Sequence, residues 1–144
     1  MPSPSKTILQ TLIQLGLTQA FDAPTPDWPT FNGNMPATPF NAVGTYDSVN
    51  KMDGRSMRTG IYVEHPGVQV RVRSIKYEDG YQKISDIRDA LDALYKVEVL
   101  FQKPAQNVVL ASCSRTSSIL YLGYTKNSDN RTFEFSINYN ITTN

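Results

Sequence analysis

The run Gly67–Lys76 (GVQVRVRSIK) limits the possible folds more than any other stretch of the chain. Apolar and polar side chains alternate along it with a period of two, which is the pattern of a β-strand with one face on a hydrophobic core. The predicted core face holds three valines: Val68, Val70 and Val72. The opposite face holds an amide and two cationic side chains: Gln69, Arg71 and Arg73. The chain is therefore predicted to contain a sheet that is strongly cationic on its outer face at this strand.

Two amphipathic helices are predicted to cover that sheet. The longer helix spans Tyr81–Tyr95, where large apolar side chains recur every three or four residues. These side chains are Tyr81, Ile84, Ile87, Leu91, Leu94 and Tyr95. The shorter helix spans Ser5–Leu15, with Ser5 as its N-terminal cap and Gly16 at its end. Its apolar stripe consists of Ile8, Leu12 and Leu15, widened by Leu9 and Ile13.

The last third of the chain is predicted to be β-structure. Strand patterns cover Val97–Gln102, Val108–Arg115 and Ile119–Thr125, and Lys126–Asn130 supplies turn residues. Arg131–Ile141 then alternates with little interruption. Its apolar face holds Phe133, Phe135, Ile137, Tyr139 and Ile141. We expect these strands to form a meander with one face on the helices.

Between the first helix and the first clear strand, from Thr18 to about Gly60, the periodic pattern is lost. Five of the nine prolines fall between Pro24 and Pro39, and proline disfavours a regular helix. One short strand is predicted near Asn41–Tyr46. Loops of this length are usually functional or disordered. The aromatic residues in this one predict a loop that packs either on its own domain or on a neighbour.

The element order predicts one α+β domain over residues 1–144. It is a mostly antiparallel β-sheet packed against two α-helices, with a long proline-rich N-terminal loop. The length of 144 residues and a hydrophobic content of 40% allow one ordinary core. The predicted core residues are Val68, Val70, Val72, Ile84, Ile87, Leu91, Leu94, Phe133, Phe135, Ile137 and Tyr139. Truncating a large apolar one to Ala is expected to cost about 2–5 kcal/mol of stability.

Charge and terminal sequence narrow the class of protein further. Fourteen basic and 13 acidic side chains give a net charge of +1, so the total charge does not indicate a nucleic-acid-binding protein. The N-terminus lacks the features of a secretion signal, and no apolar run reaches the length that spans a bilayer. We expect a protein that is not exported through a signal peptide and does not act in a membrane.

The sequence offers few side chains for catalysis or metal binding. His65 is the only histidine, and we interpret it as a loop residue because Glu64 beside it would point to the opposite face of a strand. Cys113 is the only cysteine, and strand alternation places it on a buried face with Val109 and Ala111. Phosphate-binding, dinucleotide-binding and serine-nucleophile motifs are absent from the sequence. We therefore predict that the protein is not an enzyme and has no catalytic, cofactor-binding or metal site.

The charged residues are segregated along the chain. Residues 51–76 hold six cations and two acids, a balance of +4, whereas residues 78–98 hold six acids and three cations, a balance of −3. One interpretation is a head-to-tail contact, in which the basic strand and loop of one subunit meet the acidic helix of the next. That predicted interface consists of Arg55, Arg58, Arg71, Arg73, Asp86, Asp89 and Asp92. The alternative is that the two faces partly neutralise each other within one monomer.

Several motifs follow one another in a characteristic order between Met35 and Leu91. A proline-containing segment leads into a strand that ends at a tyrosine, and a glycine-containing loop follows. Next come the strand GVQVRVR and an aromatic-bearing turn into a helix. The residues that fit this layout are Pro36, Pro39, Tyr46, Gly54, Arg55, Gly67, Gln69, Arg71, Arg73, Tyr77 and Tyr81. In this stretch the chain resembles the bacteriophage minor-capsid or tail-terminator family.

The resemblance implies a structural protein of the virion that is assembled in the bacterial cytoplasm and lies at the head-proximal end of the phage tail. Tail terminators form a ring, typically hexameric, that caps the tail tube, stops its polymerisation and provides the head–tail joining surface. The implied partners are other copies of the chain, the tail tube protein and the head–tail connector or stopper protein. DNA would pass through the channel without sequence-specific binding.

Two segments are candidates for docking on the tube or the connector, namely Asp22–Phe40 and Asn50–Gly60. The docking residues predicted in them are Trp28, Phe31, Met35, Asp53 and Met57. The alternative is that both segments pack on their own domain. Two other functions also stay open: a head-completion or stopper protein at the portal, and a small cytosolic ligand-binding α/β module with a concave apolar pocket.

Overall fold

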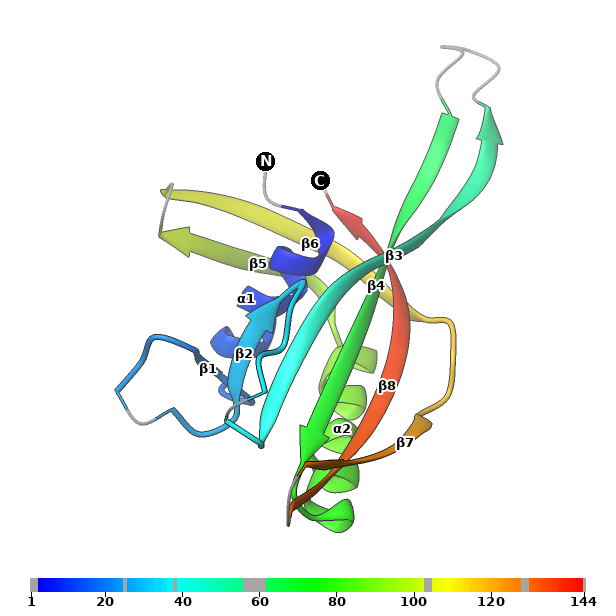
Figure 1. Ribbon diagram of the computed structural model, residues 1–144. Helices are drawn as coiled ribbons and strands as arrows, with labels where there is room; N and C mark the ends of the chain where they lie inside the picture. The colour runs from blue at the N-terminus through cyan, green and yellow to red at the C-terminus, as the bar shows by residue number, and fades with distance from the viewer. Residues whose placement is uncertain are drawn as a thin grey trace.

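A computed structural model of the chain describes residues 3–24, 26–37, 39–55, 62–102, 105–127 and 130–143. It contains one curled, mostly antiparallel sheet of eight strands, and two helices pack against it (Figure 1). The predicted α+β class with a single domain is therefore confirmed. The elements are α1 (Pro4–Gln14), β1 (Gln19–Ala20), β2 (Pro29–Asn32), β3 (Ala42–Arg55), β4 (Tyr62–Ser74), α2 (Tyr77–Asp92), β5 (Tyr95–Gln102), β6 (Ala105–Arg115), β7 (Leu120–Asn127) and β8 (Asn130–Thr143).

The strand order is β1-β2-β3-β4-β8-β6-β5, and β7 also pairs with β8. The predicted meander of the C-terminal strands is wrong, because β6 and β7 do not pair with each other but share one edge of β8. The other edge of β8 pairs with β4. Between β6 and β7, Thr116 N donates to Asn138 O at 2.9 Å and Asn138 N donates to Ser117 Oγ at 3.0 Å. These bonds hold the connection against β8 and so let two strands follow one another along the same edge.

β3 is much longer than the short strand predicted near Asn41–Tyr46. It pairs with β4 from Ala42 to Arg55, with register irregularities between Ser48 and Lys51 and between Met52 and Gly54. A strand interrupted in this way does not alternate regularly in sequence, so its length is visible only through its partner. The stretch from Thr18 to about Gly60, where no regular pattern was found, also contains β1 and β2, which are short and parallel to their neighbours.

α1 starts and ends close to the predicted positions. Its cap is Ser3 and not Ser5: Lys6 N donates to Ser3 Oγ at 3.3 Å, and Pro4 stands in the first turn, where its missing N–H is harmless. The chain leaves the helix at Gly16, which has a φ of +79°. Ile8 and Leu12 are fully buried.

α2 begins and ends earlier than predicted. It includes Gly80, which is required there because a Cβ at this position would lie 2.6 Å from Ser74 Oγ and 3.0 Å from Phe135 Cε2. The N-terminal half of the helix can therefore pack closely on β4 and β8. Tyr95 lies outside the helix and begins β5, where its side chain is 72% exposed, so its predicted place on the helix face is wrong.

The predicted core is confirmed for the most part. The three valines of β4, the apolar face of α2 and the inward face of β8 form one buried cluster, in which Ile87 is fully buried. Leu94 and Phe133 are only partly buried against it. In the part of the chain that the structure describes, neither helix has the length and apolarity needed to cross a membrane.

Candidate assembly surfaces

Arg73 does not lie on an exposed cationic face, as its position in the alternating strand predicted, but is only 8% exposed. Its Nε donates to Phe40 O at 3.1 Å, and its Nη2 donates to Pro39 O at 2.8 Å and also to Pro36 O. Burial lowers the pKa of Arg73, while the carboxylate of Glu134 acts in the opposite direction. The side chain therefore fastens the proline-rich segment to the sheet of its own subunit.

Arg71 is the cation of this strand that stays partly exposed. Its Nε donates to Gln69 Oε1 at 3.0 Å, and its guanidinium lies 5.2 Å from the centre of the Tyr46 ring. Burial raises the pKa of Tyr46, and Arg71 partly offsets that effect. Of the other predicted interface cations, Arg55 lies in β3, but its side chain and all of Arg58 fall outside the described residues.

The three aspartates of α2 that were predicted to lie at the interface have partners within the chain. Asp86 Oδ1 accepts from Gln82 Nε2 at 2.8 Å, and Asp89 forms an ion pair with Arg88 at 3.1 Å. Asp92 lies 3.4 Å from Arg115 Nε of β6. Gln82 is neutral, and Arg88 and Arg115 lie outside the basic stretch 51–76, so these contacts do not join the two charged stretches. The charged contact between subunits and its alternative within one monomer both stay predictions.

The predicted docking residues of the proline-rich segment also contact their own domain. Trp28, at a φ of +53°, packs against the core, with Lys83 Nζ 5.3 Å from its ring centre. Phe31 stacks on Phe21 with ring centres 5.7 Å apart, and Met35 is partly buried.

The second docking candidate, Asn50–Gly60, begins in β3. The register of β4 with β8 runs as far as Gly67 and that of β3 with β2 as far as Thr45, and β3 and β4 continue past these points paired with each other as a two-stranded ribbon. Figure 1 shows this ribbon projecting away from the rest of the molecule. Asp53 lies in the ribbon, although its side chain is not described, and Met57 falls outside the described residues.

A surface that the sequence interpretation missed lies at the N-terminal end of α2 and along β7. Six large apolar side chains, each between 45% and 57% exposed, form what we call the aromatic patch: Ile75, Tyr77, Tyr81, Tyr121, Leu122 and Tyr124. Leu120 is 44% exposed but pairs with Ser136, next to the pair of Tyr121 with Phe135, so it points to the other face of β7. The sequence does hold a signal for it. Three consecutive residues of β7 (LYL) are large and apolar, so that strand is apolar on both faces, which a strand with one wet face would not be.

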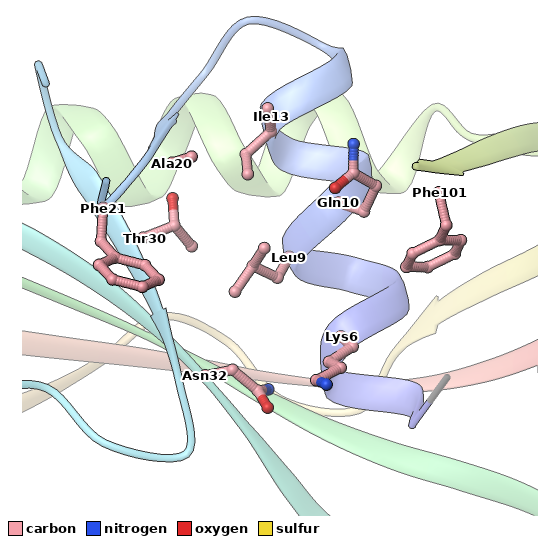
Figure 2. Close-up of a pocket in the computed structure, with 9 residues that line it drawn as sticks. All are labelled: Lys6, Leu9, Gln10, Ile13, Ala20, Phe21, Thr30, Asn32 and Phe101. Atoms are coloured by element: carbon pink, nitrogen blue, oxygen red, sulfur yellow. The ribbon is translucent and has the colours of Figure 1, made fainter. Parts of the chain in front are cut away.

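A second missed surface is a hollow beside α1, which we call the α1 groove (Figure 2). Its volume is about 270 Å³. Leu9 and Ile13, predicted to widen the buried stripe of α1, instead line this groove together with Phe21 of the connection after β1 and Phe101 of β5. The remaining lining residues are Lys6, Gln10, Ala20, Thr30 and Asn32.

The side chains considered for catalysis occupy structural positions. Cys113 is buried as predicted, but on the face of Val108 and Leu110, because a register shift between Leu110 and Ser112 changes the alternation of β6. Burial, with a smaller contribution from Asp92, raises the pKa of the Cys113 thiol to about 12, which disfavours a nucleophilic thiolate.

His65 lies in β4, in the ribbon, and not in a loop as predicted. Its Nδ1 lies 3.2 Å from Thr142 Oγ1. Among the residues whose placement is described, no group of three His, Cys, Asp or Glu side chains could hold a metal ion.

Comparison with known proteins gives one informative match. Residues 11–144 match the family described as bacteriophage tail terminator protein. No curated protein sequence matches the chain. One solved structure is 19% identical over 97% of both chains with a TM-score of 0.36, a likeness too distant to bear on fold or function. Because the family match covers nearly the whole sequence, the chain belongs to the bacteriophage tail terminator family and is a structural, non-enzymatic component of the phage tail.

Proposed function

We propose that the protein forms a ring of six subunits on the head-proximal end of the tail tube. The ring stops tube polymerisation, provides the surface that joins the head connector and leaves a channel for DNA. The observation that carries this proposal is the family match over residues 11–144. The match also favours the tail end over a portal-side position, and over a small ligand-binding module.

The shape of the subunit supports different contacts for its different parts. The compact body offers surfaces for neighbouring subunits, while the β3–β4 ribbon reaches beyond it (Figure 1). An isolated two-stranded ribbon is marginal in water, so a ribbon of this kind gains most from a partner. We assign the ribbon, together with the segment Asn50–Gly60, to docking on the tube or the connector. The proline-rich segment is held to its own domain by Arg73 and Trp28, which makes it the weaker docking candidate.

Native mass spectrometry of the purified protein, alone and mixed with isolated tail tube protein, tests the ring. A discrete hexamer, or a ring that forms only with the tube, is expected. A monomer or dimer that is indifferent to the tube contradicts the proposal.

The docking role of the ribbon has its own test. Replacing residues 56–60 by two glycines should leave the ring intact and abolish its attachment to tubes or to heads. Normal attachment by this variant would exclude the ribbon as the docking element.

The predicted charged contact between subunits can be tested at Arg71, because Arg73 is committed to the fold. If Arg71 meets the acidic helix of the next subunit, Arg71→Glu should weaken the ring, and weaken it less at high salt. A ring unchanged by this reversal would exclude the charged contact and leave the ring itself in place.

A further inference from the structure

We propose that the aromatic patch of one subunit binds the α1 groove of the next copy of the chain, and that this is the main contact around the ring. The inference rests on the proposed ring and names the two surfaces that build it. They lie on different sides of the molecule, the patch at the start of α2 and on β7, and the groove beside α1, β2 and β5 (Figures 1 and 2).

Contacts between aromatic rings fix the tyrosines of the aromatic patch in place. The ring of Tyr77 makes edge contacts with Tyr121 at 5.4 Å, with Phe133 at 5.9 Å and with the buried Phe135 at 5.1 Å between centres. Tyr81 stacks on Tyr77 at 6.4 Å. Side chains already fixed in this way lose little conformational entropy when a partner covers them. Tyrosine is also among the residues that carry most of the binding energy in protein interfaces.

The size of the patch matches a protein interface. A tyrosine side chain buries about 150–250 Å² when fully covered, so four half-exposed tyrosines and two half-exposed aliphatic side chains offer roughly 400–600 Å². The largest apolar patch on a typical monomer is about 300–600 Å². A stable complex buries about 800 Å² on each partner. Most of one side of a specific interface is therefore already present.

The occupant must be a different surface if a ring is to form. A patch that bound its own copy on a neighbour would close a two-fold dimer, whereas a ring needs two distinct surfaces that bind head to tail. Outside the patch, the exposed large apolar side chains among the described residues are Leu15, Phe21, Tyr95, Leu100 and Leu120. Of these, Phe21 lines the α1 groove, a hollow that can receive protruding side chains.

The α1 groove and the α2 end of the patch are bordered by charges of opposite sign, while at the β7 end Arg131 lies 5.2 Å from the centre of the Tyr124 ring. Lys6 is exposed at the α1 groove, and Glu78 and Asp79 are exposed in the first turn of α2, next to Tyr77 and Tyr81. A lysine approaching the N-terminal turn of α2 would meet these two carboxylates. Such pairs fix the orientation of a contact more than its affinity.

The test uses one charged substitution on each surface, Leu122→Glu in the patch and Phe21→Glu in the groove. Both side chains are exposed, at 45% and 63%, so both variants should keep the thermal stability of the parent chain. Tyr95→Glu, at a large apolar residue that is 72% exposed and belongs to neither surface, is the matched control. In native mass spectrometry with tail tube protein present, each surface variant should lower the ring population at least tenfold, and the control should not.

Mixing the two surface variants gives the sharpest outcome. Each variant keeps one intact surface, so the mixture should form a heterodimer with a single contact and no ring, while neither variant dimerises alone. Rings that form normally from Leu122→Glu but no longer bind tubes would assign the patch to the tube and overturn the inference. Loss of the ring in Leu122→Glu alone, with Phe21→Glu unaffected, would also overturn it. If the parent chain forms no ring with or without tubes, the proposed function itself fails.

Discussion

The guanidinium of Arg73 lies between the sheet and the proline-rich segment, where it meets the backbone carbonyls of Pro36, Pro39 and Phe40. Proline has no N–H, so a proline-rich segment offers more acceptors than donors, and buried acceptors need partners from elsewhere. Arginine suits this role because its planar fork presents several donors in fixed directions. The Arg73 side chain thus satisfies backbone carbonyls that would bond to backbone N–H groups in a helix or sheet.

Removing that side chain should loosen the segment. We expect Arg73→Met to lower the free energy of unfolding by about 2–4 kcal/mol, because buried carbonyl groups lose a charged donor. Urea denaturation followed by circular dichroism measures the change. Arg71→Met on the same strand is the control and should cost less than about 1 kcal/mol, since Arg71 is partly exposed. Equal losses in the two variants would show that Arg73 does not fasten the segment.

At the scale of elements, α1 and β5 are joined by one amide side chain. Gln14 Nε2 donates to Glu98 O at 2.9 Å, and Leu100 N donates to Gln14 Oε1 at 3.2 Å. The end of the helix therefore takes the place of a neighbouring strand along the outer edge of β5. Because a free sheet edge can pair with another chain, this contact protects the edge as well as positioning the helix.

The Gln14 contact predicts a local effect. In Gln14→Ala, the amide of Leu100 should exchange with solvent at least tenfold faster, since it loses its acceptor at a partly exposed edge. Amides of β4 and β8 should keep their protection. Hydrogen exchange measured by NMR distinguishes the Leu100 amide from the amides of β4 and β8. If the Leu100 amide were equally protected in both proteins, the hydrogen bond to Gln14 would not be what shields it.

At the scale of the whole molecule, the C-terminal strand joins the two halves of the sheet. β8 pairs with β4 from the N-terminal half and with β6 and β7 from the C-terminal half. Its residue Tyr139 is fully buried and lies near Cys113 on β6, and burial raises the pKa of both groups. Their neutral forms are thus part of the centre of the fold.

Global stability should therefore fall at high pH. The pKa of Cys113 is raised from 9.0 to about 12. Well below pH 9 the thiol is therefore neutral in both the folded and the unfolded chain, and its full contribution to the free energy of unfolding is present. As the pH rises from about 9 to about 12, the unfolded chain releases the proton that the folded chain keeps, and stability is lost. For Cys113 alone the loss is about 2–3 kcal/mol at pH 11, and the raised pKa of Tyr139 adds to it above pH 10.

Urea denaturation between pH 8 and pH 11 measures this loss. Cys113→Ala should be less stable than the parent at pH 8, because a buried side chain is truncated, and should lose less stability as the pH rises. If the free energy of unfolding fell equally steeply with pH in the two proteins, the Cys113 thiol would not keep its proton in the folded chain.

The sequence alone determined the features that depend on local geometry. Alternation in β4 and β8 and the three-to-four spacing in α2 predicted which side chains face the core, because the direction of a side chain follows from its own strand or helix. The order of motifs from Pro36 to Tyr81 predicted the family in the same way, since it is a property of the chain and not of its packing.

The tertiary structure decided what depends on partners far along the chain. The length of β3, the shifted phase at Cys113 and the burial of Arg73 follow from β4, β8 and the proline-rich segment, which no local pattern encodes. The aromatic patch and the α1 groove belong to the same class, because each gathers side chains from elements separated in sequence. A surface exists only once those elements are packed, so the extent of both surfaces was decided by the fold.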